Sequence, residues 1–96
     1  EEPVSRLALR PPWPNPFRYS TSIVFMAPED GVATVSIYEV TGRLVRKLPA
    51  QSITAGRNEV VWDGRSDDRI AARSGVYFIR VETGGETAYG KVVLFE

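Results

Sequence analysis

The chain has 96 residues, of which 43% are hydrophobic and 25% charged, and its 12 basic and 12 acidic side chains give a formal net charge of zero. These values are typical of one globular domain, and no apolar run approaches the roughly 18 residues of a membrane-spanning helix. A neutral balance builds no field that attracts nucleic acid, and the absence of cysteine and histidine removes disulfides, the usual zinc sites and the usual nucleophile–base pairs. We therefore expect no membrane span, no nucleic-acid partner and no cofactor.

The first 20 residues contain the stretch "PPWPNPF", whose four prolines hold the backbone extended or in turns and exclude a helix. This stretch predicts an entry strap, with Trp13 covering the end of the domain. Two leucines ahead of it alternate with polar or small neighbours, which predicts a short edge strand over residues 6–10. We expect residues 1–12 to be a linker end with this edge strand, and residues 13–96 to be the folded domain. The start lacks the basic and then apolar pattern of a signal peptide, so we expect the chain to be a piece of a longer protein.

Two alternating segments follow the strap. Residues 20–27 are rich in β-branched and aromatic side chains, and the "PEDG" after them is typical of a tight turn. Residues 32–38 alternate in the same way, which predicts a second strand with one buried face. The side chains expected to share the inward sides of the two strands are Ile23, Phe25, Ala27, Ala33, Val35 and Ile37.

A charged segment, "RLVRKL" over residues 43–48, follows a break at Gly42. Strict alternation places its two leucines and Arg46 on the side opposite Val45. Lysine and arginine discourage pairing with other molecules at the edge of a sheet, so we expect an edge strand here. Residues 49–56 are expected to form a loop.

Three further strands complete the pattern, over residues 58–63, 75–82 and 88–95, and the "TGGE" between the last two is typical of a glycine turn. Phe78 and Arg80 are expected to face outward. The side chains expected to face the core are Val60, Trp62, Tyr77, Ile79 and Val81.

Short strands separated by turn signals at regular spacing are typical of two packed antiparallel sheets. Parallel strands, which are buried on both faces, would give continuous apolar runs instead of alternation. We therefore predict an all-β fold, an immunoglobulin-like β-sandwich of about seven antiparallel strands in two sheets, with no helix.

A polar cluster of three aspartates and three arginines lies between two of the predicted strands, over residues 63–73. Asp63, Asp67 and Asp68 offer the oxygen ligands of a calcium site, but their spacing does not fit the helix-loop-helix pattern and the arginines balance their charge. A glycosidase-like carboxylate pair needs a substrate cleft, for which a domain of this size has little room.

The interpretation we prefer for this cluster is a solvated connection between strands. Asp63 would cap the end of one strand and form a turn with Gly64, and the remaining charges would stay in water. After it, Gly75 would let the backbone re-enter the sheet without a Cβ clash, and Tyr77 would be a core anchor whose hydroxyl bonds a nearby backbone group. We therefore predict that the chain holds no metal and is not an enzyme.

Exposed aromatic side chains raise a separate hypothesis, since rings on one face of a sheet can stack on sugars. Under this hypothesis, a polysaccharide is an alternative partner of the domain. The aromatic residues concerned are Trp13, Tyr19, Tyr38, Phe78 and Tyr89.

Six segments of the chain occur in an order that resembles a known family. They are "NPF", "TSIVF", "VSIYEVTGRLV", "AGRNEVVWDGR", "SGVYFIRV" and "KVVLF". In this order they resemble the type A C-terminal sorting domain of the Bacteroidetes type nine secretion system, and the related immunoglobulin-like domain of the flagellar hook-capping protein. The resemblance covers nearly all of residues 13–96. It departs after "NPF", where the family usually has a further Asn-Pro and this chain has Arg18 and Tyr19.

The resemblance implies a non-catalytic targeting domain that directs secretion, through the periplasm, and cell-surface attachment of a larger extracellular protein. Its partners would be the outer-membrane secretion machinery and upstream catalytic or adhesive domains of the same chain. By motif match, the recognition residues would be Gly75, Tyr77, Lys91, Val92, Val93 and Leu94. The positions with a structural role would be Asn15, Pro16, Phe17, Gly42, Trp62, Asp63 and Gly64. The alternative hypothesis is an accessory carbohydrate-binding or spacer module of a secreted hydrolase.

Overall fold

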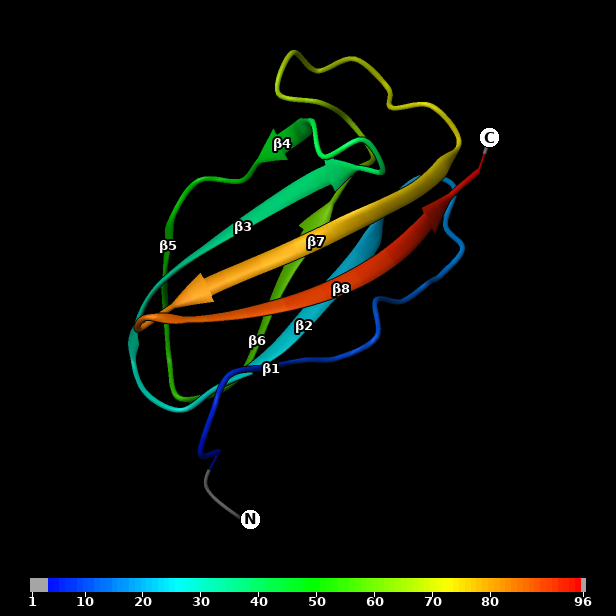
Figure 1. Cartoon of the computed structure of the whole chain (residues 1–96). Coiled ribbons are helices and arrows are strands. Elements are labelled where there is room, and N and C mark those ends of the chain that lie inside the picture. Colours follow the sequence, from blue (N-terminus) through cyan, green and yellow to red (C-terminus); the bar gives the residue numbers. More distant parts are fainter. Residues whose placement is uncertain (1–3, 96) are drawn as a thin grey trace.

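The computed structural model describes residues 4–95, which form eight strands in two antiparallel sheets. The strands are β1 (Ala8–Leu9), β2 (Thr21–Ala27), β3 (Gly31–Glu39), β4 (Leu44–Lys47), β5 (Gln51–Ile53), β6 (Gly56–Trp62), β7 (Gly75–Thr83) and β8 (Glu86–Leu94). The sheets pack face to face, and Figure 1 shows β2 and β6 crossing behind β7 and β8. Within residues 4–95 there is no helix of sufficient length and apolarity to span a bilayer. The predicted all-β sandwich is confirmed.

The smaller sheet has the strand order β1-β2-β6, and the larger has the order β4-β3-β7-β8. The larger sheet gains a fifth strand because β5 pairs with Gly31–Ala33 at the start of β3. The prediction of a loop over residues 49–56 is therefore wrong in its middle, where Ile53 is buried. Three residues are too few to show a period-two pattern, so alternation alone did not indicate this strand.

Side-chain alternation places the core between the two sheets. Every side chain that was predicted to face inward is buried, with at most 9% of its surface exposed. Phe78, predicted to face outward, is 42% exposed. Burial of each large apolar side chain of this kind contributes about 1.5–3 kcal/mol.

The edge strand β4 departs from strict alternation. It ends the larger sheet, as predicted, but its pairing with β3 shifts register between Ile37 and Tyr38. Leu44 lies opposite the outward-facing Tyr38, whereas Arg46 lies opposite the buried Ile37. The prediction that Leu44 and Arg46 share a side is therefore wrong, because the β-bulge turns Arg46 toward the inner side of the sheet.

The proline-rich strap passes from one sheet to the other. It begins as β1, which pairs with β2, and continues to Trp13, whose N–H donates to the Ser22 carbonyl at 3.1 Å. It then reaches the larger sheet, where the Phe17 N–H donates to the Val93 carbonyl at 2.9 Å and Phe17 and Leu94 form a parallel bridge. The Trp13–Pro14 and Asn15–Pro16 peptide bonds between these contacts are cis. The strap, blue in Figure 1, therefore joins the open edges of β2 and β8.

Three aromatic rings fill the end of the sandwich where the strap meets β8. The rings of Phe17 and Trp62 pack edge to face with centroids 5.4 Å apart, and those of Trp62 and Tyr77 are 5.3 Å apart in the same geometry. The Trp62 Nε1–H donates to the Arg65 carbonyl at 3.0 Å, so its polar atom is satisfied within the core. Trp13, predicted to cover this end, is 77% exposed, and Phe17 fills that place instead.

The two tryptophans provide a test of this architecture. Trp62 is fully buried and Trp13 is 77% exposed. We expect Trp62→Ala to lower the free energy of unfolding by about 3–5 kcal/mol because it leaves a cavity. Trp13→Ala should change it by no more than about 0.5 kcal/mol. Urea denaturation followed by circular dichroism measures both, and a greater loss in the Trp13 variant would contradict the arrangement described here.

Candidate functional site

Segments from four parts of the chain meet at the end of the sandwich where β8 ends. Phe17 of the strap, Trp62 of β6, Tyr77 of β7 and Leu94 of β8 are all buried there. Gly64 lies among them with φ of +74°, and a Cβ on it would lie 3.4 Å from Phe17 Cε2. A larger residue at this position would therefore meet both an unfavourable backbone conformation and a close contact.

The polar loop that follows β6 is organised around Arg46 of β4. The Arg46 Nη1 donates to Asp63 Oδ1 at 3.3 Å and to the carbonyls of Arg65 and Ser66 at 3.2 and 3.4 Å. Its Nε lies 3.8 Å from Asp67 Oδ1. Because Arg46 is only 17% exposed, this guanidinium joins the edge of one sheet to the loop that leaves the other.

The same loop covers the outer edge of β4. The Asp67 N–H donates to the Val45 carbonyl and the Lys47 N–H donates to Asp67 Oδ1, both at 3.0 Å. Asp63 Oδ1 accepts the Arg65 N–H at 3.1 Å and so forms the predicted turn with Gly64. Asp67 stays in water as predicted, with its side chain 53% exposed, but it also replaces the missing neighbour of an edge strand, which the prediction did not include.

Sequence reasoning missed the role of Arg46 and treated it as an edge charge. Its acidic partners lie 17 and 21 positions further along the chain, and matching charges at such distances do not by themselves indicate contact. The three aspartates and three arginines of the loop balance one another in the sequence, so its composition gave no signal that a cation from another strand would bind there. Asp63, Asp67 and Asp68 do not form a metal cage: residues 4–95 contain no group of three or more potential metal ligands, and Arg46 lies between the first two aspartates.

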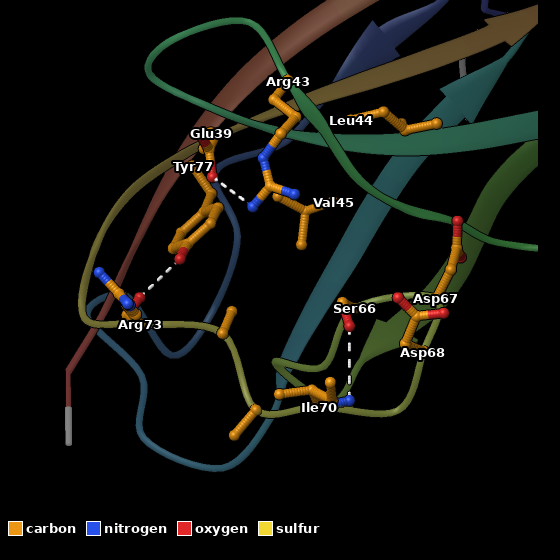
Figure 2. Close-up of a pocket in the computed structure, with 12 residues that line it drawn as sticks. Glu39, Arg43, Leu44, Val45, Ser66, Asp67, Asp68, Ile70, Arg73 and Tyr77 are labelled. Atoms are coloured by element: carbon orange, nitrogen blue, oxygen red, sulfur yellow. Dashed lines mark hydrogen bonds and ion pairs between the residues drawn. The ribbon is translucent and has the colours of Figure 1, made fainter.

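A hollow of about 640 Å³ lies between this loop and the turn that joins β3 to β4. Figure 2 shows Glu39 and Arg43 on one side of the hollow and Asp67 and Asp68 on the other. The Arg43 Nη2 donates to Glu39 Oε2 at 3.0 Å, and this bond, with one from Thr41, lowers the pKa of Glu39. A general acid of a glycosidase needs a raised pKa, so Glu39 is a poor proton donor at neutral pH.

The motif positions fall into buried and exposed groups. Tyr77, Val92 and Leu94 are at most 5% exposed, so their side chains belong to the core. Lys91 is exposed and Val93 half-buried on the outer side of β8. A partner that touches the surface of the folded domain at these positions would therefore meet Lys91 and Val93.

Three other motif residues shape the backbone. Gly75 has φ of +155°, which L residues rarely adopt because a Cβ crowds the local backbone, and beyond its chain neighbours no atom lies within 4 Å of the place of a Cβ. Glycine is therefore required by the backbone conformation and not by the approach of another segment. Gly42 lies in the turn between β3 and β4, where its N–H donates to the Glu39 carbonyl at 2.9 Å. Asn15 caps the open edge of β8, because its Oδ1 accepts the Val93 N–H at 2.9 Å and its Nδ2 donates to the Lys91 carbonyl at 3.5 Å.

The five aromatic residues considered for sugar binding do not share one surface. Tyr38 of β3, Phe78 of β7 and Tyr89 of β8 lie at outward positions of the larger sheet. Trp13 belongs to the strap beside β2, and Tyr19 lies near the end of the sandwich beside Arg65 and Phe95. Only the first three can form a common face.

Two antiparallel sheets packed face to face, with a first segment that passes from one sheet to the other, are features of the immunoglobulin-like class of β-sandwich. Residues 20–86 match the FlgD Ig-like domain, and the chain belongs to this family.

Solved structures share the fold. The chain is similar to dimeric latent PorU from Porphyromonas gingivalis, with a TM-score of 0.72 and 24% identity over 93% of this chain and 9% of that one. It is similar to PorZ, an essential surface component of the type-IX secretion system of the same organism, with a TM-score of 0.66 and 24% identity over 93% of this chain and 12% of that one. The alkylpurine DNA glycosylase AlkC of Pseudomonas fluorescens gives a TM-score of 0.63 and 18% identity, over 95% of this chain and 30% of that one. No curated protein matches the chain in sequence.

The contacts of Arg46 predict a measurable contribution to stability. Hydrogen bonds from a charged donor are worth about 1.5–3 kcal/mol, and the exposure of the acidic partners reduces this, so Arg46→Ala should cost about 1–2 kcal/mol. Arg57→Ala is the matched control, since Arg57 is 62% exposed and, within residues 4–95, forms an ion pair only with Glu59. It should cost no more than about 0.5 kcal/mol. Equal urea midpoints for the two variants would contradict the role of Arg46.

The environment of Tyr77 predicts a dependence of stability on alkaline pH. Burial raises the pKa of Tyr77 above its ordinary value of 10.0, and its hydroxyl donates to the Arg73 carbonyl at 2.6 Å. Because the folded state favours the neutral ring, its contribution is complete below the unfolded pKa and is lost as pH rises through the folded value. Between about pH 9 and about pH 11 the wild type should therefore lose more stability than Tyr77→Phe. Tyr19→Phe, which alters an 80% exposed ring, should keep the wild-type slope, and equal slopes for all three proteins would refute this assignment.

Proposed function

We propose that the chain is a non-catalytic C-terminal targeting domain that directs secretion and cell-surface attachment of a larger extracellular protein. The observation that carries the proposal is the meeting of the strap, the ends of β6 and β7 and the last strand at one end of the sandwich. They contain four of the six segments whose order resembles the type A sorting domain of the type nine secretion system. The family membership and the likeness of fold to PorZ are consistent with this role.

The proposed partner is the outer-membrane secretion machinery, which would recognise a folded surface in preference to a linear peptide. Tyr77, Val92 and Leu94 are buried, so they would act by holding the shape of this end. Lys91 and Val93 are the motif side chains available for contact, and Asn15 fixes the backbone on which they lie. Among the six candidate recognition residues, we therefore assign direct contact to Lys91 and Val93.

The remaining assignments follow from this role. Residues 13–96 would be the sorting domain, the route would pass through the periplasm, and the final location would be the medium or the cell surface. Enzymatic or adhesive activity would belong to upstream domains of the same protein.

Export of a fused reporter tests the proposal in a host that has the secretion system. A reporter carrying the wild-type domain should reach the surface or the medium, and deletion of residues 91–96 should leave it in the periplasm. Because that deletion also removes core residues, Lys91→Glu provides the sharper variant, and it should likewise retain the reporter in the periplasm.

Lys47→Glu is the matched control, because Lys47 is an exposed lysine on the opposite edge of the same sheet. It should be exported like the wild type, and both lysine variants should keep the wild-type melting temperature within about 2–4 °C. Normal delivery of the deletion variant would refute a targeting function, and normal delivery of Lys91→Glu alone would refute the assigned contact.

A further inference from the structure

The outer face of the larger sheet carries three aromatic rings around one arginine. Tyr38 lies directly opposite Phe78, and Arg80 lies directly opposite Tyr89. Side chains at alternate positions of paired strands project on the same side and lie within reach of their diagonal neighbours. Phe78 is 42% exposed and Tyr89 70% exposed, so these rings lie at the surface. We call Tyr38, Phe78, Arg80 and Tyr89 the aromatic face.

Arg80 is held close to the sheet. Its Nη2 donates to Glu82 Oε2 at 2.9 Å, and its Nε is buried without a hydrogen-bond partner among the described residues. Ser36, which lies opposite both Arg80 and Lys47, is only 5% exposed although it faces outward. Neighbouring side chains must cover this serine, and long side chains such as those of Arg80 and Lys47 can lie along a sheet in this way.

This face is positive, although the whole chain is neutral. The charged residues at outward positions of β3, β4, β7 and β8 are Lys47, Arg80, Glu82 and Lys91. Three cations against one anion leave a net charge of +2, since 3 − 1 = 2. The Tyr38 hydroxyl and then Glu82 raise the pKa of Arg80, so the guanidinium keeps its charge. An occupant that complements the face therefore carries negative charge.

The spacing of the rings indicates a polymer. Strands lie about 4.8 Å apart and residues rise about 3.3 Å each, so Tyr38 on β3 and Tyr89 on β8 are separated by roughly 12 Å. One sugar ring cannot cover both side chains. A chain of sugars that crosses β3, β7 and β8 would meet both, and would pass Arg80 between them.

We propose that the aromatic face binds an acidic polysaccharide, a chain that contains uronic acid residues. The rings of Phe78 and Tyr89 stack on the apolar faces of the sugars, and the cations Arg80 and Lys91 pair with their carboxylates. This site shares Lys91 with the contact proposed for the secretion machinery, but its rings lie on the outer face of the sheet and not in the buried aromatic end. The proposal does not depend on a role in secretion.

Affinity electrophoresis in native gels tests this assignment. The wild-type chain should be retarded in gels that contain polygalacturonate and should run freely in gels with hydroxyethylcellulose. Phe78→Ala and Tyr89→Ala should each weaken binding about three- to tenfold, as expected for the loss of one stacked ring. Trp13→Ala and Tyr19→Ala remove rings that are 77% and 80% exposed on other surfaces and should bind like the wild type.

Four results would overturn the proposal. They are free migration of the wild type in polygalacturonate, equal retardation in the neutral polymer, wild-type binding by the Phe78→Ala/Tyr89→Ala double variant, and equal retardation by polyaspartate, which has the charge but no sugar. Melting curves of the five variants establish that a loss of binding does not reflect unfolding. Because binding is measured on the isolated chain, failure here leaves the export experiment unaffected, and the reverse also holds.

Discussion

The fold depends on the buried aromatic contacts from Phe17 through Trp62 to Tyr77. Each ring comes from a different segment, and the edge-to-face geometry fixes all three relative to one another. Phe17 reaches this place because its backbone pairs with the last strand, and Tyr77 is fixed by its bond to the Arg73 carbonyl. Loss of any ring would therefore loosen the strap, the polar loop and the end of β8 together.

The loop after β6 has two roles: its aspartates are neutralised by Arg46, and it covers the open edge of β4. Its aspartates would repel one another if they stood alone, and β4 would offer unpaired backbone groups to other chains. Arg46 compensates the negative charge of Asp63 and Asp67. Asp67 forms hydrogen bonds with the backbone groups of β4 that no strand pairs with. A cluster with the composition of an ion site therefore serves to attach the loop to the edge strand β4, through Asp63 and Asp67 on the loop and Arg46 on the strand.

Alternation was sufficient to predict the core side chains of β2, β3, β6 and β7, because inward and outward residues of these strands follow a strict period of two. It failed where the period is interrupted. β5 is too short to display a period of two, and the bulge opposite β4 turns the Arg46 side chain to the other face of the sheet. It also failed for Trp13, because proline-rich segments follow no period and composition does not decide which aromatic ring is buried. The contacts of the site could not be predicted from the sequence, since those of Arg46 and Asn15 depend on which strand edges become neighbours.

The bond between Asn15 and Val93 joins residues 78 positions apart in the chain. During synthesis the strap emerges early and its partner strand emerges last, so the aromatic end remains open until nearly the whole domain has been made. Contacts of such long range form late and slowly. A binding partner that requires this closed end would therefore respond only after β8 has been made, and a product truncated before β8 would lack the feature that it recognises.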